Sequence, residues 1–397
     1  MTSRPNIAGF RGSDWDNAGK NLYAVLYDNK KQCDVIHRSK DRGRTFKAWC
    51  DLTSVPKPDI NQYYWYSIPL IIPSKVNDDE PDQMLISPIG SQTLYRCKDI
   101  SQDRPRFDPV LTPGGADPGR AGVFNGFAEN KIDGIDFDGT IYVGWYAIYS
   151  QSNQALLYKA TAADSYTTWE PMNHWQARHI HAVRVNPFNG YLYVVLGEPN
   201  LNHPGEAPTA ADAALIGGAD AAKIMRSRDG GKNWFTVTNT WNIEVKVVQG
   251  NWLGLYFSTL GFVPGTNIVV LGEDTDWVQG SIFYFDDDGR EGTSESIVPQ
   301  LIYTTDNAGE FFNGAVSMGD KLYFASQFLA PTQGVTSTKC VSTTDGTSWT
   351  VEQVCPSPEY ASNPADNSCL GVFTYHPERG GRLIYSLSTS DSFIIDQ

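Results

Sequence analysis

Two histidines one residue apart, His179 and His181, could carry out acid–base chemistry or hold a metal ion. In an extended strand, residues two apart project to the same side, so both imidazoles would point the same way. Histidine titrates near neutral pH and acts as a general base or a metal ligand. The alternative is that the pair only binds water or backbone inside a channel. The sequence offers no third ligand, so we predict no metal site here.

Other residues could complete a site for sugars around this pair. Arg178 stands directly before this pair, and Tyr64 is expected in the same site. Aromatic side chains present an apolar face and a polar tip, while carboxylates and amides bind hydroxyl groups. Packing between sheets is the other interpretation of each aromatic residue. The remaining candidates for ligand binding are Tyr63, Trp65, Asn125, Trp145, Tyr146, Glu198, Trp252, Glu273 and Asp276.

A repeated turn motif indicates which elements position these residues. The motif is Ser-x-Asp-x-Gly-x-Thr/Asn-aromatic, present as SKDRGRTF at 39–46 and SRDGGKNW at 227–234. Such an Asp accepts backbone N–H groups of its own turn, glycine supplies a positive φ, and the aromatic side chain packs inside. The motif therefore predicts a hairpin turn rather than a catalytic Asp. Weaker copies stand at 342–349, 304–312, 163–169 and 98–107.

The segments around the turns predict short antiparallel strands. The fullest unit has strands at 179–185, 191–198, 222–228 and 234–237. Similar first strands recur roughly every 57 residues, a spacing typical of propeller blades. We therefore predict a single all-β domain, a seven-bladed β-propeller of four-stranded antiparallel blades, with six blades as the alternative. The expected blades are 5–53, 61–112, 124–173, 178–240, 250–312, 313–356 and 369–397, the last closed by the N-terminal segment.

By these turn motifs, which we call boxes, the chain resembles the Asp-box (BNR-repeat) β-propellers, the superfamily that includes sialidases. The resemblance implies the fold over most of the chain. It does not imply sialidase activity, because that family uses an amino-terminal FRIP-like motif, an Arg triad and a Tyr–Glu pair. Here the first segment holds Arg4 and Arg11 but no FRIP, and no triad or pair can be assigned. Some polysaccharide lyases on propeller scaffolds use His or Tyr as the base and Arg to neutralise the uronate. By analogy, the candidates for these roles here are Arg178, His179, Tyr64 and Tyr146.

The meander also predicts which face of the propeller carries a site. Connections alternate between two faces, so the boxes share one face and the starts of the first strands share the other. Two long inserts, 199–221 and 273–280, are expected on that second face. A ligand site is expected there, at the mouth of the central channel.

Six cysteines and two acidic runs allow further predictions. Cys33 and Cys50 flank the first box symmetrically, and Cys340 and Cys355 flank the late one. Each pair could lie opposite on neighbouring strands and form a disulfide; buried thiols are the alternative. Cys97 and Cys369 have no evident partner. We predict no cofactor but leave a structural calcium ion open at two runs that lack the spacing of a calcium loop: Asp286, Asp287, Asp288 and Gly289; Asp133, Asp136 and Asp138.

The amino-acid composition disfavours some classes of binding partner. The 31 Lys and Arg against 45 Asp and Glu give a net charge of −14, which disfavours nucleic acid and anionic membranes. No apolar run approaches the ~20 residues that span a bilayer, and the N-terminus shows no secretory signal pattern. We expect an extracellular or virion-associated protein that acts on a glycan as a hydrolase or uronate lyase. The alternative is a non-catalytic virion tail or surface component that binds glycans or other structural proteins.

Overall fold

Most of the residues that the computed structural model describes lie in β-strands. One short 3-10 helix, η1 (Ala162–Asp164), joins two of them. No helix among the described residues is long and apolar enough to cross a membrane. The described residues are 2–3, 12–16, 20–28, 30–31, 33–53, 68–72, 81–88, 93–113, 122–129, 139–147, 155–177, 179–197, 220, 222–239, 246–248, 251–253, 257–274, 279–289, 297–308, 310–328, 337–356, 372–374, 382–386 and 392–396.

Over these residues the strands form seven four-stranded antiparallel sheets and one two-stranded sheet. We number the four-stranded sheets along the chain. Sheet one is β2 (Gly12–Trp15), β3 (Leu22–Asp28), β4 (Cys33–Ser39) and β5 (Lys47–Asp51); sheet two is β6 (Ile68–Ile72), β7 (Gln83–Ser87), β8 (Leu94–Cys97) and β9 (Phe107–Leu111). Sheet three is β10 (Gly122–Glu129), β11 (Ile141–Ala147), β12 (Ala155–Ala160) and β13 (Glu170–Trp175); sheet four is β14 (Ile180–Val185), β15 (Leu192–Leu196), β16 (Lys223–Ser227) and β17 (Phe235–Asn239). Sheet five is β20 (Phe257–Phe262), β21 (Ile268–Glu273), β22 (Gln279–Asp286) and β23 (Gln300–Ala308); sheet six is β24 (Glu310–Met318), β25 (Lys321–Phe328), β26 (Ser337–Thr343) and β27 (Thr350–Pro356). Sheet seven is β28 (Val372–Thr374), β29 (Arg382–Ser386), β30 (Ser392–Asp396) and β1 (Thr2–Ser3), and the small sheet is β18 (Lys246–Val248) with β19 (Asn251–Leu253).

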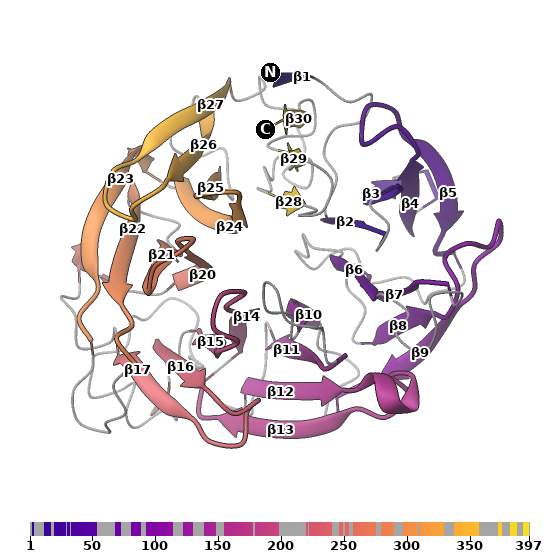
Figure 1. Ribbon diagram of the computed structural model, residues 1–397, viewed down its shortest axis with the longest axis horizontal. Helices are drawn as coiled ribbons and strands as arrows, with labels where there is room; N and C mark the ends of the chain where they lie inside the picture. The colour runs from indigo at the N-terminus through magenta and orange to yellow at the C-terminus, as the bar shows by residue number, and fades with distance from the viewer. Residues whose placement is uncertain are drawn as a thin grey trace.

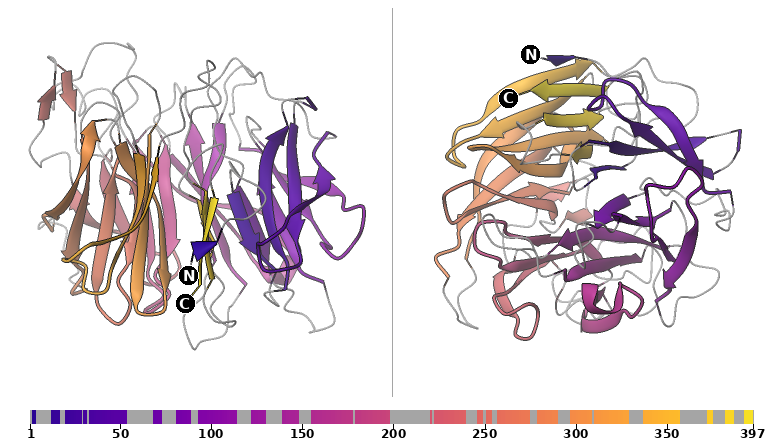
Figure 2. Two further views of the ribbon diagram at one scale, coloured as in Figure 1. Left: turned by 90° about the horizontal axis from the view of Figure 1, so that it is seen from above. Right: turned by 45° about the vertical axis from the view of Figure 1, so that its right-hand side comes forward.

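The sheets stand around a common centre, as in a β-propeller (Figure 1). The first strand of each sheet, such as β14 or β20, lies nearest the centre, and later strands lie farther out. Seen from the side, the strands run roughly along the axis of the ring (Figure 2). Sheet seven joins both ends of the chain, because β1 pairs with β30 and places Thr2 opposite Ile395.

Apolar side chains fill the space between neighbouring sheets. Between sheets four and five, Tyr193 and Val195 pack with Phe257, Leu260 and Leu271 in one buried cluster. Inner strands are covered on both sides, so every residue of β15 and β20 is buried. The outer strand β5 is half-exposed. Burial of this apolar surface is the main driving force that holds the sheets together.

The predicted boxes are the turns between third and fourth strands. In sheet one, the Gly43 N–H donates to Ser39 Oγ at 2.8 Å, and the Thr45 N–H donates to Asp41 Oδ1 at 2.8 Å. In sheet four, Asp229 Oδ1 accepts the N–H groups of Lys232 and Asn233 at 3.0 and 2.9 Å. The turn chemistry expected from the motif is therefore confirmed in these two sheets.

The proposed copy at 304–312 is wrong as a box. Residues of this segment belong to β23, which ends at Ala308, and to β24, which begins at Glu310. The turn after the third strand of sheet five instead follows Asp286, where the Gly289 N–H donates to Asp287 Oδ1 at 3.1 Å. The first strand of this sheet is β20, and the segment near Leu253 belongs to the separate β18–β19 hairpin.

The expected opposition of cysteines is also wrong. Cys33 lies opposite Asp28 of β3 and Cys50 lies opposite Ile36, because the β4–β5 register, which pairs Arg38 with Lys47, is not centred midway between the two cysteines. Both are free thiols. In sheet six, Cys340 lies opposite Gln353, whereas Cys355 lies opposite Thr338. Symmetry about a box in the sequence therefore did not predict cross-strand neighbours.

Candidate functional site

Four inner strands share an irregularity near their first residues. The register with the second strand shifts, as at a β-bulge, in β10, β14, β20 and β24. In β14 the shift leaves His181 between the paired residues Ile180 and Ala182. This end of the sheets lies opposite the box turns, since the second strands end here and the third strands begin. Bulges often redirect side chains next to functional sites.

The two histidines meet at this end of sheet four. Their Nε2 atoms are 2.8 Å apart, and His179 and His181 expose 0% and 3% of their surface. His181 Nδ1 lies 2.7 Å from the Phe257 carbonyl oxygen of sheet five and 3.6 Å from Asp274 Oδ2. The structure therefore brings together the predicted pair and adds a carboxylate that the prediction did not include.

These contacts assign the protons of the neutral pair. A carbonyl oxygen only accepts, so His181 Nδ1 must carry the hydrogen that it donates to Phe257. The Nε2 of a neutral His181 then accepts, and the His179 Nε2–H is the donor. The contact therefore needs a single hydrogen between the two Nε2 atoms. Two additional protons would place N–H against N–H and break the contact.

The contact from His181 has an equivalent one sheet later. Ser258 is the residue at the register shift of β20, and its Oγ donates to the carbonyl oxygen of Phe312 in β24. His181, at the register shift of sheet four, binds the carbonyl of Phe257, which directly precedes the shift of sheet five. In the same way, Ser258 binds the carbonyl of Phe312, which directly precedes the shift of sheet six. His181 therefore helps to join neighbouring sheets, in the way that Ser258 does.

Two buried carboxylates lie on the neighbouring strand ends. Glu273 ends β21 opposite Phe257 and is 4% exposed. Glu310 begins β24 and is fully buried, and its Oε1 accepts the Ser326 hydroxyl at 2.5 Å. Gly272 packs against Phe312, where an added Cβ would lie 2.7 Å from the carbonyl oxygen, so β21 and β24 approach closely. Ionisable groups thus gather at one end of sheets four to six.

The other predicted site residues fall in three groups. Trp145 is 6% exposed and packs with Leu85 and Tyr158, so this aromatic side chain belongs to the core between sheets two and three rather than to an open mouth. Asn125, Tyr146 and Trp252 lie in β10, β11 and β19. Those outside the described residues are Tyr63, Tyr64, Trp65, Arg178, Glu198 and Asp276.

The sequence held a signal for this arrangement that the prediction missed. The pentapeptide VVLGE occurs at 194–198 and again at 269–273, at the ends of the second strands of sheets four and five. Its glycine permits close packing in both sheets: a Cβ on Gly197 would lie 2.5 Å from His179 Cδ2. The repeat aligns the two strand ends and would have drawn attention to Asp274, the next residue after the second copy.

In the acidic run at the end of β22, Asp287 takes part in packing between sheets four and five. The buried Asp287 carboxylate accepts hydrogen bonds from Arg226 Nη1 and Tyr193 Oη of sheet four. Burial and the neighbouring Asp287 raise the pKa of Tyr193 above its usual value. No group of three or more His, Cys, Asp or Glu suited to a metal ion is found in the described part of the chain. Asp133, Asp136 and Asp138 lie outside it.

Comparisons with known proteins support the fold. No protein-family model and no curated protein sequence matches the chain. Among solved structures, a chain of the mitotic checkpoint complex aligns with a TM-score of 0.53 at 10% identity over 100% of this chain and 91% of that chain. The Dos1 propeller aligns with a TM-score of 0.53 at 10% identity over 98% and 78%. A GH74 enzyme of Niastella koreensis aligns at 0.45 with 13% identity over 97% and 65%, too distant to support an argument. These likenesses show the β-propeller fold alone.

Proposed function

We propose that the chain is a seven-bladed propeller of the Asp-box type that recognises an extracellular or cell-surface glycan. Each four-stranded sheet would be one blade, and the glycan would bind where the inner strands begin. If the protein is catalytic, the carboxylates of Glu273 and Glu310 are the best candidates for acid and base of a glycoside hydrolase. Glycosidases use two carboxyl groups that flank the scissile bond.

The gathering of buried ionisable groups at one end of sheets four to six supports this proposal best. Burying a charge costs several kcal/mol unless it is paired or hydrogen-bonded, so such groups are seldom kept for stability alone. Clusters of this kind are typical of functional sites. A lyase that uses His179 or His181 as base is less well supported, because their Nε2 atoms bind each other and His181 Nδ1 binds the Phe257 carbonyl oxygen.

Turnover and binding on a panel of neutral and acidic polysaccharides test the proposal. The variants Glu273→Gln and Glu310→Gln keep the side-chain shape, and Asp320→Asn alters an exposed acid of sheet six as a control. For an acid–base pair we expect each Gln variant to lose about 100-fold or more in kcat while the control stays unchanged. Failure of the wild-type protein to bind or cleave any glycan on the panel would refute the proposed function.

A non-catalytic role as a virion tail or surface component is the second candidate. The equivalence of His181 and Ser258 favours it, because both side chains join sheets and neither needs a substrate. On this alternative, the protein binds glycans or structural proteins without turnover, and the Gln variants change binding only. A monomer that binds neither cells nor structural proteins would count against it.

A further inference from the structure

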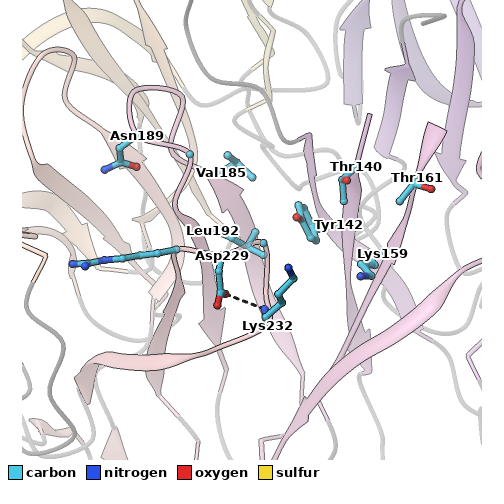
Figure 3. Close-up of a pocket in the computed structure, with 12 residues that line it drawn as sticks. Thr140, Tyr142, Lys159, Thr161, Val185, Asn189, Leu192, Asp229 and Lys232 are labelled. Atoms are coloured by element: carbon cyan, nitrogen blue, oxygen red, sulfur yellow. Dashed lines mark hydrogen bonds between the residues drawn. The ribbon is translucent and has the colours of Figure 1, made fainter. Parts of the chain in front are cut away.

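A pocket opens on the box face, between sheets three and four. Its volume is about 390 Å³, within the range of about 300–1,000 Å³ common for small-molecule sites. The wall from sheet three carries Tyr142 and Lys159, and the box turn of sheet four contributes Asp229 and Lys232. Figure 3 shows the Lys232 side chain extending from the box turn towards Tyr142. The pocket lies at the opposite end of the sheets from the histidine pair.

The charge of this pocket contrasts with that of the whole chain. Lys159, Arg228 and Lys232 line it, with Asp229 as the one acidic residue in the lining. Lys159 also pairs with Glu170 outside the lining, at 3.4 Å between Nζ and Oε2, so three cations stand against two carboxylates. The Asp229 carboxylate already accepts the N–H groups of Lys232 and Asn233 and the Asn233 side-chain amide. A local excess of positive charge therefore sits on a protein of net charge −14. Such a pocket attracts anions.

A glycine keeps this pocket open where another box has a large side chain. Gly230 lines the pocket with a φ of +68°, and Arg42 holds the same place in the first box with a φ of +60°. The turn itself therefore accepts a side chain at this position. At Gly230 a Cβ would lie 3.3 Å from Tyr142 Oη, so glycine leaves space above the tyrosine. Because φ at this position is similar in both boxes, the glycine at position 230 is explained by the pocket and not by the turn.

The remaining lining suits a polyhydroxylated ligand. The hydroxyl groups of Thr140 and Thr161 and the side-chain amide of Asn189 can each donate and accept hydrogen bonds. Arg228 is fixed by two contacts, a hydrogen bond from Nη2 to the Gly289 carbonyl and stacking at 5.0 Å from the centre of the Tyr191 ring. A bare inorganic anion would use the cations and leave these polar groups without a ligand partner.

We propose that this pocket binds an acidic saccharide unit, whose carboxylate or sulfate lies near Lys159 and Lys232 and whose hydroxyls face the threonines. The proposal does not depend on the glycan site at the other end of the sheets. Either site can exist without the other, and His181→Asn should leave binding here unchanged.

Ligand-observed NMR titrations of the full chain with D-glucuronate, D-glucose and sodium sulfate test it. We expect glucuronate to bind at least tenfold more tightly than glucose, and more weakly at high salt. Lys232→Glu and Lys159→Glu should each weaken glucuronate binding about tenfold, a change of about 1.4 kcal/mol. Arg44→Glu is the matched control, because Arg44 occupies the place of Lys232 in the first box; it should change affinity by less than twofold.

Gly230→Arg separates shape from charge. It installs the residue that the first box tolerates and adds a positive charge, so it should abolish glucuronate binding by filling the pocket while the melting temperature stays close to wild type. Stronger binding by this variant would overturn the proposal, since charge alone would then explain the affinity. Equal affinities for glucuronate and glucose, equal affinities for glucuronate and sulfate, or equal effects of Lys232→Glu and Arg44→Glu would also overturn it.

Discussion

Replacement of Asp287 by asparagine should strongly destabilise the junction between sheets four and five. The Arg226 and Asp287 side chains form an ion pair in which they are only 1% and 2% exposed. Tyr193 Oη donates to the same carboxylate, and the Gly289 N–H does so from the turn. Asparagine keeps the shape of the side chain but removes the negative charge that faces a buried guanidinium.

The size of the effect follows from this burial. Removing one partner of a buried ion pair costs about 3–5 kcal/mol, because the remaining charge stays out of water without compensation. The loss of a hydrogen bond to a charged group, here from Tyr193, accounts for about 1.5–3 kcal/mol of such a change. These contributions overlap, so we expect a total of about 3–5 kcal/mol for Asp287→Asn.

Urea unfolding followed by tryptophan fluorescence measures this change as a lower midpoint. Asp286→Asn is the matched control: it removes the same charge from the neighbouring exposed residue and should stay within about 0.5 kcal/mol of wild type. A double-mutant cycle with Tyr193→Phe should show coupling, since both side chains share one hydrogen bond. Equal midpoints for Asp287→Asn and Asp286→Asn would refute the assignment of stability to this ion pair.

Three further predictions concern pH and packing. Burial raises the pKa of Tyr23 to about 12, against about 10 in an unfolded chain, so the free energy of unfolding should fall as the pH rises from about 10 to 12. Tyr23→Phe should make this fall less steep, and an unchanged slope in alkaline denaturation would contradict the prediction. The Asn233 N–H, with other donors, lowers the pKa of Asp229 to about 2, against about 3.9 when unfolded, so the stability from this box is present above pH ~4 and is lost as the pH falls towards 2. Acid unfolding should show a weaker pH dependence in Asp229→Asn, and an unaltered profile would contradict this. Gly197→Ala places a Cβ 2.7 Å from both imidazole Nε2 atoms, so it should separate the pair and destabilise the protein by about 1–3 kcal/mol; an unshifted imidazole N–H resonance in NMR would show that the pair had survived.

The box turns could be predicted because their chemistry is local. Ser39, Asp41 and Gly43 lie within five residues, and their hydrogen bonds close within the same turn. The repeat spacing then placed His179 and His181 at the start of an inner strand, where the structure has them. Features that depend on one short segment and its repetition were therefore accessible from the sequence.

Other features depend on register and on contacts between sheets. The β4–β5 register pairs Arg38 with Lys47 and so leaves Cys50 opposite Ile36 rather than Cys33, and no local pattern in the sequence specifies this register. Asp274 approaches His181 only because sheet five packs on sheet four. Trp145 also looked like a ligand platform, whereas the neighbouring sheet covers it. Such outcomes come from packing between segments far apart in the sequence, which residue types alone do not specify.

The pairing of β1 with β30 has a consequence for how the protein folds. Most paired residues lie within about 20 positions of each other, as Leu322 and Thr343 do, whereas Thr2 and Ile395 are separated by nearly the whole chain. Loop-closure entropy grows with the logarithm of this separation, which makes the last pairing about 3 kcal/mol less favourable to initiate than a hairpin. Sheets one to six can each form from consecutive strands, so sheet seven should be completed last in refolding. Separation of β1 from β30 is then the expected first step of unfolding, and backbone hydrogen exchange should be fastest at this strand pair.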